Sequence, residues 1–62
     1  MNKPRDFEVG QRVQAHPATD RWMRGDRFGT VEEVGTRFVW VRFDLSGDLV
    51  KLDASLLMDA SW

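Results

Sequence analysis

The sequence predicts a small all-β domain, a barrel or sandwich of about five short strands. Short runs of β-branched and aromatic residues recur at close spacing with turn signals between them, as in small barrels and sandwiches. No segment has room for a helix of ordinary length. The 62 residues contain no cysteine, so one domain must fold without disulfides, from a chain that is 42% hydrophobic. We expect a flexible tail over residues 1–6, a single domain over residues 7–59 and a short tail over residues 60–62.

The first strand is predicted at residues 11–16, where Val13 and Ala15 share one face of an alternating pattern. Pro17 ends it because proline has no amide hydrogen to donate to a sheet. Residues 17–26 show no period and contain proline, glycine and two aspartates, so we expect a loop there.

The second strand is predicted at residues 27–34. Val31 and Val34 lie three positions apart, which breaks strict alternation, and a bulge at Glu32–Glu33 would turn both valines inward. Gly35 and Thr36 follow as a tight hairpin turn, and a glycine in first place suits type II′.

Residues 37–43 (RFVWVRF) form the strongest predicted strand, with Val39, Val41 and Phe43 on the core face. Residues 44–48 are a turn, and residues 49–52 a strand that points Val50 and Leu52 inward. Residues 53–57 begin with a capping aspartate and have room for one 3₁₀ turn before a last strand. Leu56, Leu57 and Met58 would then complete the core.

The stretches VGQRV, GTVEEVG, VWVRFD and LVKL, in this order and with a long first loop, resemble an SH3-like barrel. The resemblance covers residues 8–58, and its short motifs imply a fold more than a function. HPATDRWMRGDRFGTV is similar to short uncharacterised proteins of actinobacteria and phages, which implies a bacterial or phage setting.

Two more distant resemblances concern function. GTVEEV and VWVRFD are similar to the photosystem I accessory subunit, which docks proteins. VGQRV is similar to the type II dihydrofolate reductase, an oligomeric enzyme whose site uses a Val-Gln-Ile-Tyr run. Here that run is Val50-Lys51-Leu52-Asp53, without either polar site residue, so the resemblance does not carry the activity over.

Composition argues against several classes of function. The net charge is −1, so bulk attraction to nucleic acid or to anionic lipid is not indicated. One histidine and no cysteine argue against a structural zinc site. The apolar runs are too short for a membrane span or a signal-peptide core. We therefore expect no membrane partner, no metal and no cofactor, and a cytoplasmic location.

Candidate binding residues fall into two groups. The first is Arg21, Trp22, Arg24 and Arg27 of the long loop; the second is the outward row Phe38, Trp40 and Arg42. Tryptophans could stack on bases while arginines hold phosphates. Alternatively, the arginines pair with Asp20 and Asp26, Trp22 or Met23 plugs an end of the barrel, and the long loop with the N-terminal tail covers the row.

The RGD triplet at residues 24–26 is interpreted as a turn rather than an adhesion signal, with Gly25 permissive and Asp26 capping or pairing with an arginine. His16 beside Pro17 is interpreted as a residue that bonds the loop rather than as a base paired with Asp20.

The function expected from the sequence is that of a small non-enzymatic binding module, with a lean towards nucleic acid or a nucleoprotein. Protein interaction or self-association through Phe38 and Trp40 is the main alternative, because tryptophan and arginine are common in protein interfaces. An oligomeric enzyme with a shared central site is a remote one.

Overall fold

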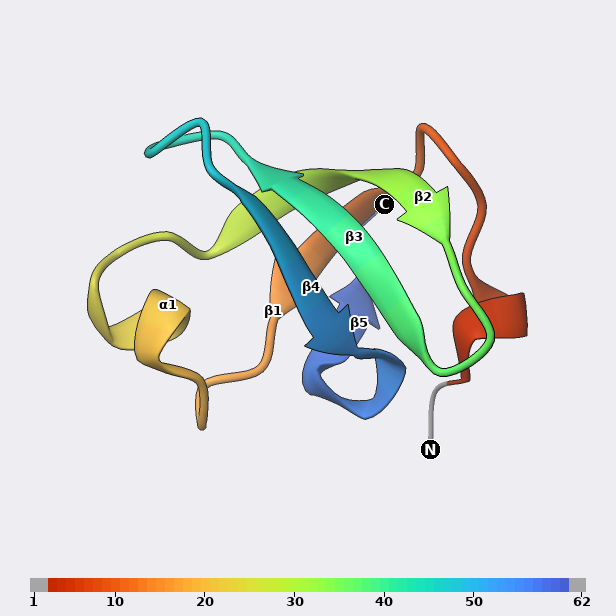
Figure 1. Ribbon diagram of the computed structural model, residues 1–62. Helices are drawn as coiled ribbons and strands as arrows, with labels where there is room; N and C mark the ends of the chain where they lie inside the picture. The colour runs from red at the N-terminus through yellow and green to blue at the C-terminus, as the bar shows by residue number, and fades with distance from the viewer. Residues whose placement is uncertain (1–2, 61–62) are drawn as a thin grey trace.

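A computed structural model describes residues 3–60 and shows one five-stranded antiparallel sheet with three short helical turns (Figure 1). The elements, in chain order, are η1 (Pro4–Asp6), β1 (Arg12–Ala15), α1 (Asp20–Met23), β2 (Phe28–Val34), β3 (Phe38–Phe43), β4 (Leu49–Asp53), η2 (Ala54–Leu56) and β5 (Leu57–Asp59). The prediction of an all-β fold with about five strands and a 3₁₀ turn before the last strand is confirmed.

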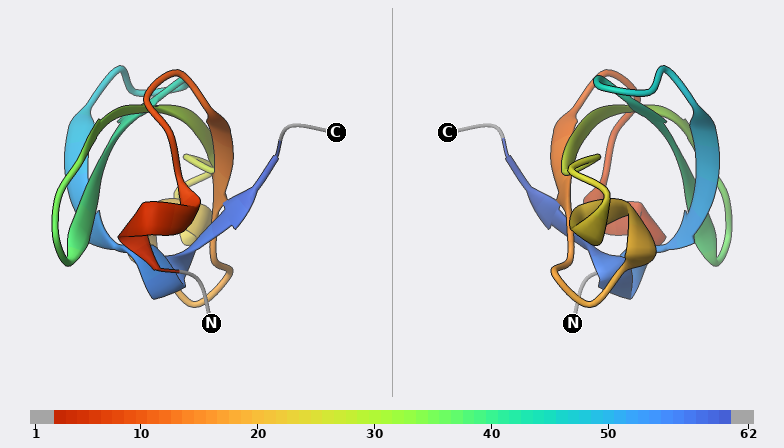
Figure 2. Two further views of the ribbon diagram at one scale, coloured as in Figure 1. Left: turned by 90° about the vertical axis from the view of Figure 1, so that its right-hand side faces the viewer. Right: turned by 90° about the vertical axis from the view of Figure 1, so that its left-hand side faces the viewer.

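The sheet curls around an interior but does not close. Its strand order is β4-β3-β2-β1-β5, so that β4 and β5 are its two edges. The chain passes from one edge to the other through η2, which turns β5 away from β4 and onto β1. Figure 2 shows the curled sheet from both ends, with η1 near one end and α1 near the other.

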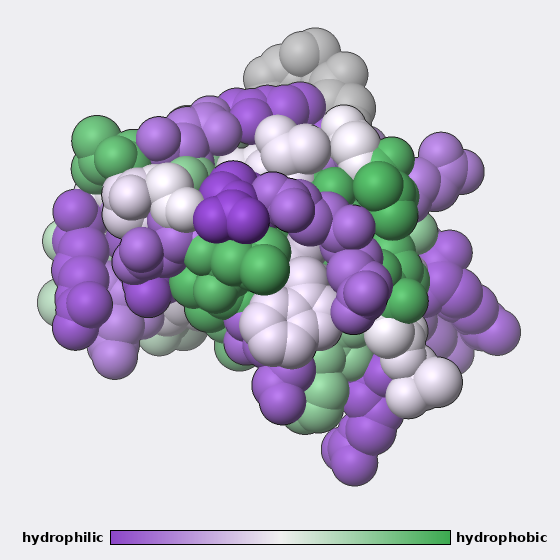
Figure 3. Space-filling view, turned by 45° about the horizontal axis from the view of Figure 1, so that its top comes forward, coloured by the Kyte–Doolittle hydropathy of each residue, from purple (hydrophilic) through white to green (hydrophobic). Residues whose placement is uncertain are grey.

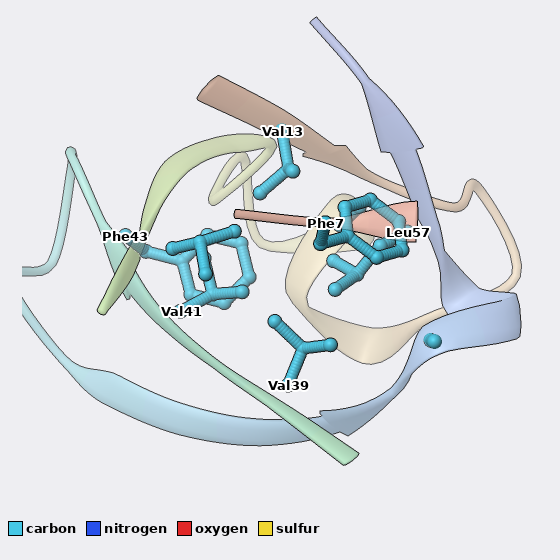
Figure 4. Packing of buried hydrophobic residues seen from close by; sticks show 9 residues of the cluster. Phe7, Val13, Val39, Val41, Phe43 and Leu57 are labelled. Atoms are coloured by element: carbon cyan, nitrogen blue, oxygen red, sulfur yellow. The ribbon is translucent and has the colours of Figure 1, made fainter. Parts of the chain in front are cut away.

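The inward row of β3 is the centre of the core. Val39, Val41 and Phe43 have no exposed surface, and Val13, Val31 and Leu57 meet them from three other strands. Figure 4 shows the labelled side chains pointing towards one another. The alternation predicted for residues 37–43 is therefore confirmed, and each such side chain contributes about 1.5–3 kcal/mol through burial.

The predicted bulge in β2 is present. Val31 pairs with Val41, but Glu33 pairs with Trp40, so that the register shifts between Val31 and Glu33. As a result Val31 is buried and Val34 packs against the core from a half-buried position. The hairpin turn that follows differs from the prediction. Three residues separate β2 from β3, and Gly35 does not adopt the positive φ that a type II′ turn requires.

β4 and η2 also follow the predicted pattern. Val50 and Leu52 pack against the core, whereas Leu49 and Lys51 are exposed. The Asp53 carboxylate accepts a hydrogen bond from the Ser55 amide at 2.9 Å and caps η2. Of the three residues predicted to complete the core, Leu57 is fully buried, and Leu56 and Met58 are half-buried.

Two segments have more regular structure than the sequence predicts. The expected loop over residues 17–26 contains α1, a single helical turn that begins after Thr19, whose side chain accepts a hydrogen bond from the Trp22 amide. In the expected N-terminal tail, Pro4–Asp6 form η1, which delivers Phe7 into the core at 5% exposure. Burial of this aromatic side chain stabilises the position of η1 against the sheet.

Candidate functional site

The predicted binding residues lie in two separate places. Arg21, Trp22, Arg24 and Arg27 belong to α1 and the loop after it, at one end of the sheet (Figures 1 and 2). Phe38, Trp40 and Arg42 alternate along the outer side of β3. Among the contacts of residues 3–60, no hydrogen bond, ion pair or ring contact joins the two groups.

Ion pairs fix Arg21 of the first group to the β3–β4 turn and to Asp26. Arg21 Nη1 lies 2.9 Å from an Asp48 carboxylate oxygen and 3.1 Å from one of Asp26. Asp26 is only 3% exposed and also accepts hydrogen bonds from the Ser46 hydroxyl at 2.7 Å and the Ser46 amide at 3.3 Å. Arg21 is therefore satisfied by carboxylates of its own chain.

The Asp26 carboxylate is stabilised in its charged form despite burial. Burial alone would raise its pKa, but the hydrogen bonds from Ser46 and Arg21 outweigh that effect and bring the pKa below its ordinary value. The RGD triplet is thus the turn that the sequence predicts, with Gly25 at a φ of 87° and Asp26 paired with an arginine.

Trp22 is stacked rather than sealed inside. The Arg27 guanidinium lies 4.3 Å from the centroid of its half-buried ring. Such a cation–π contact stabilises an exposed site by about 0.5–1 kcal/mol. Met23 is 80% exposed, so neither side chain is the buried plug that one reading of the sequence places at an end of the barrel. Arg24 is exposed and forms no ion pair within the described residues.

The second group is part of a continuous surface, which we call the β3–β4 face and define as Phe38, Trp40, Arg42, Leu49 and Lys51. Trp40 is directly opposite Lys51 in the sheet, and Arg42 is opposite Leu49. The Lys51 ammonium lies 5.0 Å from the centroid of Phe38 and 5.9 Å from that of Trp40. One cation is thus shared by two aromatic rings on an open sheet surface.

The β3–β4 face mixes apolar and charged surface. Phe38 is 37% exposed and Leu49 is 42% exposed. In Figure 3, hydrophobic and near-neutral surface appears in the middle, at the upper left and on the right of the view, with hydrophilic side chains between these areas. The long loop and η1 do not cover this face, as one alternative reading of the sequence required, because they lie towards the ends of the sheet (Figure 1).

An acidic wall borders the face on its β2 side. Arg42 Nε donates to Glu32 at 2.7 Å, and Arg42 Nη1 donates to the Gly47 carbonyl at 2.9 Å. Beside this pair, Glu32, Glu33, Trp40 and Leu49 line a hollow of about 330 Å³. The Arg42 guanidinium therefore forms an ion pair with Glu32, and Lys51 is the exposed cation of the face that is left to contact a ligand.

A larger groove, which the sequence did not reveal, lies where η1 meets the β2–β3 turn. We call it the η1 groove; its volume is about 820 Å³, and it is lined by residues 3–5, residues 34–37, Asp53 and Ser55. Lys3, Arg5 and Arg37 form no ion pair within residues 3–60. Lys3 and Arg5 are more than thirty positions from Arg37 in the sequence, so it is the fold that places these cations in one groove.

Other candidate chemistry finds little support among the described residues. His16 Nδ1 accepts a hydrogen bond from the Ala18 amide at 3.0 Å, which is the loop-bonding role that the sequence predicts. Over residues 3–60, no group of three or more potential ligands of the His, Cys, Asp or Glu types is arranged to hold a metal ion. No helix in that range is long and apolar enough to cross a membrane.

The structure thus defines a small, open all-β domain with a cation–aromatic face and a basic groove. Comparison with protein-family models, with curated proteins and with solved structures gave no match.

Proposed function

We propose that the protein is a small, non-enzymatic, cytoplasmic binding module that binds single-stranded nucleic acid through the β3–β4 face. The observation that carries the proposal is the Lys51 ammonium, which lies over the rings of both Phe38 and Trp40 on an exposed sheet, 5.0 Å and 5.9 Å from their centroids. Proteins that bind single strands combine aromatic rings, on which bases stack, with cations that follow the phosphates.

The arrangement of charge suggests how a strand would lie. On the β2 side of Trp40 the Glu32 charge is paired with Arg42 and Glu33 repels phosphates, whereas Lys51 attracts them on the β4 side. Bases would therefore stack on Trp40 and Phe38, with the sugar-phosphate backbone over β4. The loop arginines predicted from the sequence are not needed for this geometry, and Arg21 is already held by Asp26 and Asp48.

Binding of fluorescently labelled single-stranded and duplex oligonucleotides, followed by anisotropy, tests the proposal. We expect the single strand to bind more tightly, and Trp40→Ala to weaken its binding by about 5- to 150-fold, because a stacked base contributes about 1–3 kcal/mol. Trp40→Phe retains a ring and should recover most of the affinity. No binding at tens of micromolar protein would contradict the proposal.

Trp22→Ala is the matched control, since Trp22 is also half-buried and also lies beneath a cation. We expect it to leave affinity within about twofold, which is within the effect of an ordinary surface change. An equal loss for Trp22→Ala would place the site in the loop group as well, as the sequence predicts, and would contradict a site confined to the β3–β4 face.

A second candidate function is association with a protein, including a second copy of the chain. The observation that favours it is Leu49, a 42% exposed side chain on β4, which is an edge of the sheet. An exposed edge can add a strand from another chain, and exposed apolar surface beside it can be buried in the same contact. Light scattering should then show a mass that rises with concentration, and Leu49→Lys should abolish the rise.

A further inference from the structure

The cations of the η1 groove come from two distant parts of the chain. Lys3 and Arg5 flank Pro4 at η1, and Arg37 lies in the β2–β3 turn. All three are exposed, and none forms an ion pair within residues 3–60. Like charges held in one groove repel one another, so a bound anion would relieve their repulsion.

The acidic residues near the groove are already engaged. Asp53, the one carboxylate in its lining, accepts hydrogen bonds from the Ser55 amide and the Ser55 hydroxyl, both at 2.9 Å. These bonds, with Arg37 nearby, lower the pKa of Asp53. Asp6, at the end of η1, is not part of the lining, and its carboxylate accepts a hydrogen bond from the Lys3 amide at 2.8 Å.

The net charge of the groove matches that of a phosphate monoester. Three cations against one carboxylate leave a charge of +2. A phosphate monoester carries about −1.5 to −2 at neutral pH, whereas a carboxylate carries only one negative charge. Arginine also offers paired donors that fit the oxygens of a phosphate.

The size of the groove calls for more than a phosphate. At about 820 Å³ it lies in the range of sites for small organic ligands, which are about 300–1,000 Å³. Pro4 and Val34 are half-buried in its lining and provide apolar surface for a flat organic body. A phosphate for the cations, joined to an organic body for the apolar surface of Pro4 and Val34, describes a nucleotide.

We propose that the η1 groove binds the terminal phosphate of a nucleotide, with Lys3, Arg5 and Arg37 as its cationic contacts. The nucleotide is either free or the 5′-phosphorylated end of a nucleic acid strand. The inference goes beyond the proposed function, because the groove and the β3–β4 face share no residue. Either one can therefore fail without the other.

Calorimetric titration with adenosine monophosphate and with adenosine tests the phosphate requirement. We expect the monophosphate to bind at least tenfold more tightly than adenosine. In a parallel NMR titration, the amides of residues 34–37 and 53–55 should shift with the monophosphate. Equal binding of the two ligands, no binding of the monophosphate at millimolar concentration, or shifts confined to other residues would overturn the inference.

Arg37→Ala and Arg24→Ala form a matched pair. Each removes one exposed guanidinium without an ion pair among the described residues, but Arg24 lies at the α1 end of the sheet. We expect Arg37→Ala to weaken binding of the monophosphate about 10-fold or more, the effect of losing a hydrogen bond to a charged group. Arg24→Ala should change it less than twofold. Arg5→Ala is a second groove variant, and equal effects at Arg24 and at the groove would overturn the inference.

Oligonucleotides with a 5′ phosphate or a 5′ hydroxyl distinguish the two sources of the nucleotide. Tighter binding of the phosphorylated strand, lost in Arg37→Ala, would identify the strand end as the ligand. Equal binding of both strands, with the monophosphate still bound, would identify a free nucleotide. Trp40→Ala should leave monophosphate binding unchanged, and if neither strand binds while the monophosphate does, the proposed function fails and the inference stands.

Discussion

The carboxylate of Asp26 accepts a hydrogen bond of 2.7 Å from the hydroxyl of Ser46, twenty positions further along the chain. This contact joins the loop after α1 to the β3–β4 turn, and Arg21 reinforces it from the α1 side. A buried carboxylate with these partners holds two turns together that share no strand pairing.

Asp26→Asn should lower the free energy of unfolding by about 1.5–3 kcal/mol, because it removes charged hydrogen bonds to a buried group. Urea denaturation monitored by circular dichroism measures the change. Asp48→Asn is the control, since Asp48 pairs with the same arginine but its side chain is 57% exposed. We expect that exposed pair to contribute less than about 1 kcal/mol, and equal losses would contradict a special role for Asp26.

The stability of the protein should fall with acid, and Asp26 should account for part of the fall. Its pKa is lowered in the folded state, so its stabilisation is complete above the unfolded value of about 3.9 and is lost as the pH falls through the folded value. The difference in unfolding free energy between wild type and Asp26→Asn should therefore shrink as the pH falls below about 4. A difference that stays constant would show that the carboxylate charge is not involved.

Gly29→Ala should destabilise the fold, although glycine is usually a poor residue in a strand. A Cβ at this position would lie 2.6 Å from the Arg42 carbonyl oxygen and 2.6 Å from a Val41 methyl carbon. Relief requires β2 and β3 to separate, and overpacking of this kind costs about 1–3 kcal/mol. Thermal unfolding can compare it with Glu33→Ala on the exposed side of the same strand, which should change stability by less than about 0.5 kcal/mol.

The salt dependence of oligonucleotide binding should separate the role of Lys51, which is to contact a phosphate, from that of Trp40, which is to stack on a base. If Lys51 contacts a phosphate, Lys51→Ala should reduce the slope of log affinity against log salt by about 0.7, the value for one phosphate contact on a single strand. Trp40→Ala should lower affinity at every salt concentration and leave that slope unchanged. The opposite pattern in an anisotropy titration would contradict the roles assigned to these side chains.

The strands and the core were predictable because they depend on local alternation. Val39, Val41 and Phe43 alternate with polar or aromatic neighbours, and the two-residue period of a strand turns them inward together. The bulge at Glu32–Glu33 was also predictable, since Val31 and Val34 could both reach the core only if one residue was inserted. The prediction of a type II′ turn was wrong because the sequence alone did not show that Arg37 belongs to the turn rather than to the strand.

The candidate surfaces were less predictable, because they depend on long-range pairing. The contact of Lys51 with the rings of Phe38 and Trp40 follows from the register that pairs it with Trp40. The η1 groove requires Pro4–Asp6 to pack beside the β2–β3 turn, and a polar N-terminal stretch carries no signal for that contact beyond Phe7. The loop arginines were visible as a cluster, but their carboxylate partner Asp48 lies in a different turn.

The incomplete curl of the sheet has a consequence for handling the protein at high concentration. β4 has a strand neighbour on one side only within residues 3–60, so that its outer amides and carbonyls form a template for aggregation. Lysine is a residue that natural proteins use to discourage such growth, and Lys51 occupies the middle of that edge. Replacing Lys51 by a neutral residue would therefore also make it easier for strands of other molecules to add to the β4 edge and form fibrils.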